Sequence, residues 1–213
     1  MKPIILVRHG QSESNVDPLV GGWQNPGLTS LGHKQAQAVA KRLAKELSGK
    51  DFCVYSSHLK RAYETAQCIC SELETTPIVN EMLQEYQTNL DPNLSRPEAE
   101  QYKLVETKPT MNWRTFSGAE SLGELFLRAG KVLSRITDDH KEIIVIVCHG
   151  WIIDKMIAWW MGYGLEDLSA NMFATANASI SVLSISQFGE RILLKLNDTT
   201  HLNHFEEKDS FLE

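Results

Sequence analysis

Two histidines stand directly after an apolar stretch and directly before a glycine, and they are the residues of this chain best placed for chemistry. His9 lies within V-R-H-G and His149 within V-C-H-G. A neutral imidazole can act as a nucleophile or a base near neutral pH. One histidine at such a place is more often structural, but the repeated context favours a shared catalytic role. The glycine after each, including Gly150, allows backbone N–H groups to approach an anion closely.

Two arginines accompany these histidines and indicate what kind of group the site would bind. Arg8 precedes His9, and Arg61 follows a second apolar stretch within S-S-H-L-K-R-A. A guanidinium presents a planar fork of donors that matches a phosphate, and two forks from different elements would hold one phosphoryl group rigidly. Arg61 taken alone fits a solvated helix residue equally well. The four residues together predict a phosphate pocket.

The elements that must position these side chains alternate between strands and helices. We expect strands over 4–7, 52–55, 78–79 and 142–148, and an antiparallel pair over 178–185 and 191–196. We expect helices over 31–47 with Thr29 as the N-cap, 59–73, 122–136 and 151–161. This order predicts one α/β domain over 1–213, a three-layer sandwich with a mostly parallel central sheet and helices on both faces. Ligands bind such sheets beyond the carboxyl ends of the strands, where both histidines stand.

A polar segment rich in Pro and Asn interrupts this alternation. We interpret about 84–117 as an inserted region that caps the substrate side, with one amphipathic helix candidate over 97–105. Trp23, in the loop after His9, and Trp113, in the insertion, are candidates to contact substrate. The residues after His201 are polar and acidic, and we expect a loose tail there.

Composition limits the partners of the chain. It has 213 residues, a formal net charge of −6 and a sequence pI of about 5.7, which favours neither nucleic acid nor an anionic membrane. No stretch has the length of a membrane helix or a signal peptide. The four cysteines lack C-x-x-C spacing, so we expect them to be reduced, as in the cytoplasm. The expected partner is a small phosphorylated molecule, and assembly as a homodimer stays open.

Several motifs, in this order, resemble those of the histidine phosphatase superfamily, which includes the cofactor-dependent phosphoglycerate mutases. The matching segments are 8–15 (RHGQSESN), 28–36 (LTSLGHKQA), 57–62 (SHLKRA), 118–122 (GAESL), 149–150 (HG) and 197–202 (NDTTHL). The triplet R-H-G alone is a weak signal, but the ordered set is specific and extends over nearly the whole chain.

The resemblance implies roles for individual residues. His9 would be the nucleophile that becomes phosphohistidine, and Arg8, Arg61 and His149 would complete the phosphate pocket. Ser12 and Asn15 would add neutral donors. Two arginines and a second histidine, protonated when phosphate is bound, would neutralise the charge, so the resemblance implies neither a metal nor another cofactor.

A carboxylic acid is also needed, because a leaving alkoxide must receive a proton. The resemblance places this acid in an L-x-E segment after the third strand, which is Glu85 here, with Glu81 as the competing carboxylate. The chain continues from Glu85 as Y-Q-T-N-L-D-P, without the glycine and aromatic pattern of many family members. The loop that faces substrate is therefore unusual.

The favoured function is a metal-independent phosphomonoester hydrolase that acts on a small phosphorylated metabolite through phosphohistidine at His9. One alternative is a mutase-type phosphotransferase; mutases of the family are usually longer and continue E-R-x-Y-G after the acid, which this chain does not. A second alternative is a non-catalytic module that binds a phosphorylated ligand. Such modules typically lose the nucleophile or an arginine, and this chain keeps both.

Overall fold

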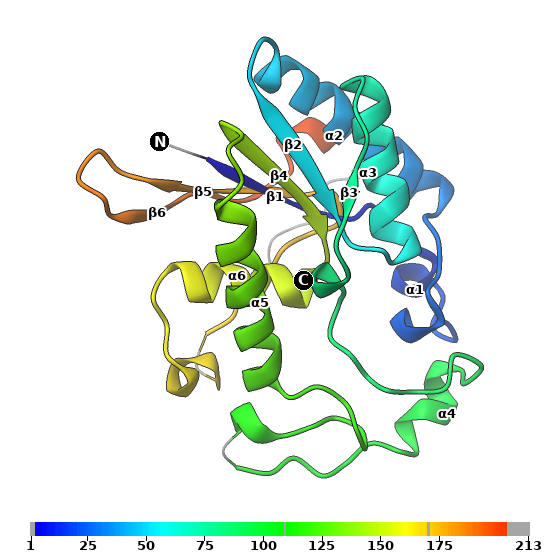
Figure 1. Cartoon of the computed structure of the whole chain (residues 1–213). Helices are drawn as coiled ribbons and strands as arrows, with labels where there is room; N and C mark the ends of the chain where they lie inside the picture. The colour runs from blue at the N-terminus through cyan, green and yellow to red at the C-terminus, as the bar shows by residue number, and fades with distance from the viewer. Residues whose placement is uncertain (1–2, 109, 170, 204–213) are drawn as a thin grey trace.

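A six-stranded sheet forms the centre of the molecule in the computed structural model, which describes residues 3–108, 110–169 and 171–203 (Figure 1). The strands are β1 (Ile4–Arg8), β2 (Phe52–Ser56), β3 (Ile78–Val79), β4 (Ile143–Cys148), β5 (Ile180–Ile185) and β6 (Arg191–Asp198). Their order is β3-β2-β4-β1-β5-β6. The first four in this order are parallel, whereas β5 is antiparallel to β1 and β6 is antiparallel to β5. The expected antiparallel pair and the mostly parallel sheet are confirmed.

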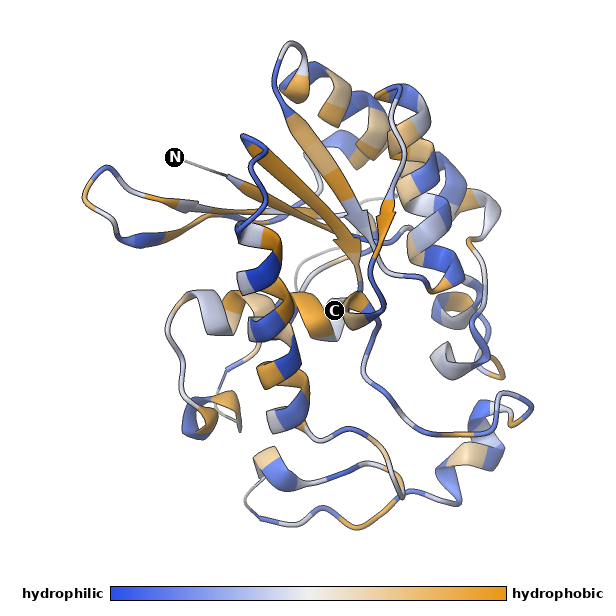
Figure 2. Ribbon diagram, viewed as in Figure 1, coloured by the Kyte–Doolittle hydropathy of each residue, from blue (hydrophilic) through white to orange (hydrophobic). Residues whose placement is uncertain are grey.

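Helices cover both faces of this sheet. The α-helices are α1 (Glu13–Val16), α2 (Ser30–Leu47), α3 (Lys60–Glu72), α4 (Arg96–Glu100), α5 (Leu122–Thr137) and α6 (Gly150–Trp160). Alternate side chains of β1 point to opposite faces: Ile4 and Leu6 pack with α5 and α6, whereas Ile5 and Val7 pack with α2 and α3. Figure 2 shows β2 and β4 largely in the apolar colour, between the two helical layers. The predicted three-layer fold is confirmed.

The register of β1 and β4 brings the two histidines together. These strands are neighbours, and Arg8 pairs with Cys148, so the next residue on each strand is a histidine. All the side chains of β4 are buried, and Leu6 and Val7 of β1 have no exposed surface. Because β1 has a strand on each side, it is central in the sheet. The buried pairing therefore fixes the relative position of His9 and His149.

The insertion is less regular than expected. The helix predicted over 97–105 is wrong in extent, because α4 ends at Glu100. Ser95 and Glu98 form a capping box at its start, but Tyr102 and Val105 are exposed by 59% and 86%, so no buried face continues the helix. Helix α1 was not predicted. Of the expected tail, Leu202 packs in the core, and 204–213 lie outside the described residues.

Candidate active site

The ring of His9, the expected nucleophile, is held neutral directly after β1. Its ring Nδ1 donates to the carbonyl of Gly10 at 2.7 Å, which leaves a lone pair on Nε2, and Arg61 donates its Nε–H to that atom at 3.1 Å. The side chain is only 3% exposed. Burial, and next the charge of Arg61, lower the pKa of His9 well below its usual value. The imidazole therefore stays unprotonated at pH values at which an ordinary histidine begins to take up a proton.

His149 lies against His9, with ring centroids 5.1 Å apart and an angle of 60° between the ring planes. Its Nε2 is 2.9 Å from the hydroxyl of Ser57, which accepts the Leu59 N–H and can donate its own proton to the ring. In that tautomer Nδ1 carries the hydrogen, and this buried atom has no partner among the described residues. Burial and Arg61 lower the pKa of His149, so the ring is neutral without ligand. From the sequence we expected His149 to be protonated with phosphate bound, and that expectation does not apply to the site without ligand.

The two arginines reach His9 from different elements. Arg61 lies in the first turn of α3, is 3% exposed, and donates from Nη1 to the carbonyl of Gly22 at 3.2 Å. Arg8 donates from Nη1 to the carbonyl of Thr175, while its buried Nε has no partner in the described part of the chain. Burial lowers the pKa of both guanidiniums, and Glu85 opposes this effect. The site thus has buried N–H donors that an anion could satisfy.

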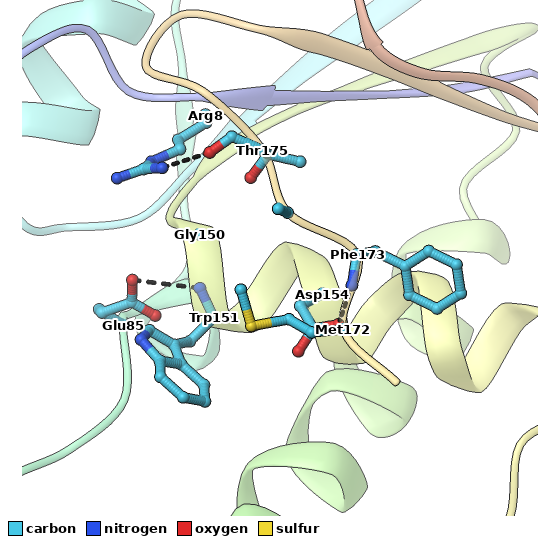
Figure 3. A pocket seen from close by; sticks show the side chains of 9 residues that line it. Arg8, Glu85, Gly150, Trp151, Asp154, Met172, Phe173 and Thr175 are labelled. Carbon is cyan, nitrogen blue, oxygen red and sulfur yellow. Dashed lines mark hydrogen bonds between the residues drawn. The ribbon is translucent and has the colours of Figure 1, made fainter. Parts of the chain in front are cut away.

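Glu85 faces the same cavity from the segment after β3. Its carboxylate accepts the N–H of Tyr86 at 3.0 Å and that of Trp151, in the first turn of α6, at 3.3 Å; Figure 3 shows the second bond. Burial raises the pKa of Glu85 against the pull of these N–H groups and of both arginines. A raised pKa suits a general acid. Glu81, the competitor, is exposed and does not line the cavity.

Arg128 of α5 clamps the segment that carries Glu85. Its guanidinium donates to the carbonyls of Met82 at 2.7 Å, Gln84 at 2.8 Å and Glu85 at 3.3 Å. It also holds the carboxylate of Glu120 with two hydrogen bonds, of 2.8 and 2.7 Å. Sequence reasoning missed Arg128, although Glu120 belongs to the segment GAESL. An arginine on the buried side of a helix near such a carboxylate was the available signal.

The loop after His9 and the insertion complete a cavity of about 520 Å³ around the nucleophile. Of the residues expected there, Asn15 and Trp23 line it, as do Arg8, His9, Arg61 and Glu85. Ser12 and His149 do not line it. Both side chains are fully buried, and the Ser12 hydroxyl donates to Oδ1 of Asn15 at 2.9 Å.

Two polar residues at the site were not expected. Ser14 lines the catalytic cavity. Asn177, which precedes β5, donates to the carbonyl of His9 and to the side chain of Asn15, both at 3.2 Å. No motif marked Asn177, because its role depends on how the chain approaches β5.

The glycines after the histidines differ in use. The N–H of Gly10 donates to the hydroxyl of Thr65 at 3.1 Å and not toward the cavity, which corrects the expected anion contact. A side chain at Gly10 would come within 2.5 Å of the Gly32 carbonyl, so close packing requires glycine here. Gly150 instead lies beside the Arg8 guanidinium. Figure 3 shows it in a second cavity, of about 230 Å³, which Arg8, Glu85 and Asp154 also line.

Two other kinds of feature are absent from the described ranges. No group of three or more His, Cys, Asp or Glu side chains is arranged to hold a metal ion there. No helix among the same residues is long and apolar enough to span a membrane.

Known proteins similar to this chain share its sequence pattern and its fold. Residues 4–199 match the family described as the histidine phosphatase superfamily (branch 1). Phosphoserine phosphatase 1 of Hydrogenobacter thermophilus is 31% identical over 219 aligned positions, which cover 96% of each chain. Phosphoglycerate mutase-like protein 4 of Arabidopsis thaliana is 39% identical over 160, covering 72% of this chain and 68% of that protein.

A solved structure, YhfR of Bacillus stearothermophilus, covers 95% of this chain and 100% of its own, with a TM-score of 0.79 and 22% identity. At that identity the likeness concerns the fold, and it agrees with the architecture described above. The family match and the relative that covers nearly the whole chain show more. This chain belongs to the histidine phosphatase superfamily, as a phosphatase-type enzyme of its first branch.

Proposed function

We propose that this protein is a metal-independent phosphomonoester hydrolase that acts on a small phosphorylated metabolite in the cytoplasm, through phosphohistidine at His9. The observation that carries the proposal is the state of the His9 ring. Gly10 fixes its tautomer and Arg61 marks the position of the nucleophilic lone pair. The match to a relative named phosphoserine phosphatase 1 makes phosphoserine the first metabolite to test. A homodimer stays a prediction.

The reaction divides into two displacements at phosphorus. In the first, His9 Nε2 attacks, the bond from phosphorus to the ester oxygen breaks, and the protonated Glu85 gives its proton to the leaving alkoxide. In the second, the Glu85 carboxylate takes a proton from water, whose oxygen attacks the phosphohistidine. Phosphate leaves, and His9 and protonated Glu85 return to their starting states. Arg8, Arg61 and His149 stabilise the charge on the phosphoryl oxygens.

A phosphoglycerate mutase is the second candidate, favoured by the match to phosphoglycerate mutase-like protein 4. Such an enzyme must keep its phosphohistidine from water. The sequence after Glu85 argues against it, because Y-Q-T-N replaces the expected R-x-Y-G. Incubation with 3-phosphoglycerate and 2,3-bisphosphoglycerate separates the two: a hydrolase releases phosphate, whereas a mutase isomerises the substrate rapidly with little release.

Hydrolysis of p-nitrophenyl phosphate and of phosphoserine in excess chelator tests the main proposal. We expect activity that survives the chelator, a trapped phosphoenzyme that is labile in acid, and loss of both in His9→Ala. His33→Ala is the matched control, because His33 is an exposed histidine of α2. Full activity in His9→Ala would overturn the proposal. If the wild-type protein binds phosphate but forms no phosphohistidine, the result would support the non-catalytic alternative.

A further inference from the structure

A third cavity, of about 320 Å³, adjoins the catalytic cavity, and aromatic rings form much of its wall. We call it the aromatic pocket. Its lining rings are those of Trp23, Tyr86, Trp113, Phe116 and Trp151. They come from the loop after His9, from both ends of the insertion and from α6, so only the folded insertion creates this wall. Rings from such distant segments form a surface that suits a flat apolar group.

The aromatic pocket is continuous with the catalytic cavity. Both are lined by Trp23, Tyr86, Thr88, Arg96 and Trp151. Trp151 is also the residue whose N–H binds the Glu85 carboxylate. Since Glu85 would protonate the ester oxygen of the substrate, the group attached to that oxygen leaves the phosphate pocket beside these shared residues. The aromatic pocket therefore lies where that group would enter.

Hydrogen bonds hold two of the rings in place before any ligand binds. The Trp23 indole donates to the carbonyl of Leu94 at 3.1 Å, and the ring lies edge-on to Phe116 with centroids 6.5 Å apart. The Tyr86 hydroxyl donates to the Thr115 hydroxyl at 3.1 Å and accepts the Thr115 N–H at 3.2 Å. A pocket whose walls are already ordered loses less entropy when it binds a ligand.

The charged groups at the rim do not offer a dedicated site for a second anion. Arg96 donates from Nη2 to the carbonyls of Ser14 and Val20, both at 2.8 Å, so this nitrogen joins α4 to the loop after His9. Glu100 lines the same pocket and brings negative charge. The indole N–H of Trp113 is buried and has no partner in the described ranges. The opposite charges of Arg96 and Glu100 and the surrounding rings favour an uncharged, largely apolar occupant, and the Trp113 N–H could bind one acceptor atom on it.

We propose that the aromatic pocket binds the organic part of the substrate, and that this part carries an aromatic ring or a similarly flat apolar group a few bonds from the phosphate. The expected hydrolysis of such substrates rests on the proposed function, whereas the expected binding in the aromatic pocket does not. It narrows the substrate class to arylalkyl and similar phosphomonoesters. A compact polar metabolite such as phosphoserine would leave the aromatic pocket empty.

Binding of non-hydrolysable phosphonates tests the pocket without catalysis. The probes are 3-phenylpropyl phosphonate and propyl phosphonate, which share the anionic group and differ in the ring. We expect the phenyl compound to bind the wild-type protein at least about tenfold more tightly by calorimetry, because the ring is taken out of water. Equal affinity of the two probes would overturn the proposal, whatever the outcome of the activity assays.

Variants locate the binding site. Trp113→Ala should reduce the preference for the phenyl probe at least about fivefold, and Trp113→Phe should restore most of it. Phe188→Ala is the matched control, since Phe188 is an 80% exposed ring far along the chain in the β5–β6 turn, and it should retain the wild-type preference. If a thermal melt shows that Trp113→Ala does not fold, the preference for the phenyl probe is measured in Trp113→Leu instead. The comparison of the two probes on the wild-type protein tests the pocket in either case. A preference unchanged in a folded Trp113 variant would contradict the assignment.

Hydrolysis then connects the pocket to the reaction. The kcat/KM for 3-phenylpropyl phosphate should exceed that for propyl phosphate by about tenfold or more, and the leaving alcohols are chemically alike, so the difference reports binding of the ring. Tight binding of the phenyl phosphonate with no hydrolysis of either ester would refute the proposed function and leave the pocket assigned. Hydrolysis of both esters at equal kcat/KM would support the proposed function and refute the assignment of the aromatic pocket.

Discussion

Replacement of Glu85 by Gln separates proton transfer from every other role of this side chain. The carboxylate accepts one backbone N–H on each oxygen, from Tyr86 and Trp151. The amide has nearly the same size but one accepting oxygen, so it keeps one of these bonds and turns its NH₂ group toward the other donor. It also lacks the proton that the acid gives to a leaving group.

The magnitude follows from these two effects. The mismatched hydrogen bond costs about 1–3 kcal/mol in the free energy of the folded site, and it affects all substrates alike. The lost proton transfer slows hydrolysis by about 10²–10⁴-fold, but only where the leaving alkoxide needs a proton. An alkyl phosphate such as propyl phosphate should therefore lose about 10²–10⁴-fold more kcat/KM than p-nitrophenyl phosphate, whose phenolate leaves without help.

Steady-state kinetics of both substrates in wild-type and variant protein measure this difference. Glu81→Gln is the matched control, because Glu81 is an exposed carboxylate four residues earlier on the same segment and should leave both values within a factor of about two. Equal slowing of the two substrates in Glu85→Gln would refute the acid role and leave only a positional one. Differential slowing in Glu81→Gln would transfer the role to Glu81.

Three further predictions concern neighbouring groups. Arg128→Lys should lower kcat for propyl phosphate by about tenfold and raise KM by less, because one ammonium cannot hold both Glu120 and the three carbonyls. A change confined to KM would contradict this. Lys155→Met should lower the free energy of unfolding by about 3–5 kcal/mol in urea titration, since it leaves the buried carboxylate of Asp154 unpaired, and a loss below about 1 kcal/mol would contradict this. Acid should also destabilise the fold as pH falls below about 6.5, because the unfolded chain takes up protons on His9 and His149 that the native chain, with lowered pKa values there, does not; each site adds up to about 1.4 kcal/mol per pH unit, and the slope should be smaller in His9→Asn.

The sequence predicted the elements with continuous buried faces best. β4, α2 and α5 lie within one residue of their predicted bounds, because each has a continuous apolar pattern that the layered fold buries. The helix predicted over 97–105 failed for the opposite reason. Ala99 is buried, but the apolar residues after Glu100 have no surface to cover, so α4 stops there and Val105 is exposed.

The residues of the candidate site also fall into two groups, those that the sequence could predict and those that it could not. His9 and His149 were predictable because each ends a buried strand. The contacts of Ser12, Arg128 and Asn177 were not, because they depend on where three loops and a helix meet. Ser12 shows the difficulty: its motif suggested a ligand contact, whereas its buried hydroxyl donates to the side chain of Asn15. A motif identifies which residues belong to a site, but not which of them face the cavity.

The pairing of Arg8 with Cys148 in the sheet has a consequence for how the enzyme loses activity. His9 and His149 directly follow β1 and β4, two central and largely buried strands, so we expect their geometry to persist until global unfolding. The insertion that carries Glu85 and the aromatic pocket has little regular structure and would open at lower free energy. Under mild denaturant, selectivity among esters would therefore disappear first, while cleavage of activated aryl phosphates persists until the sheet itself unfolds.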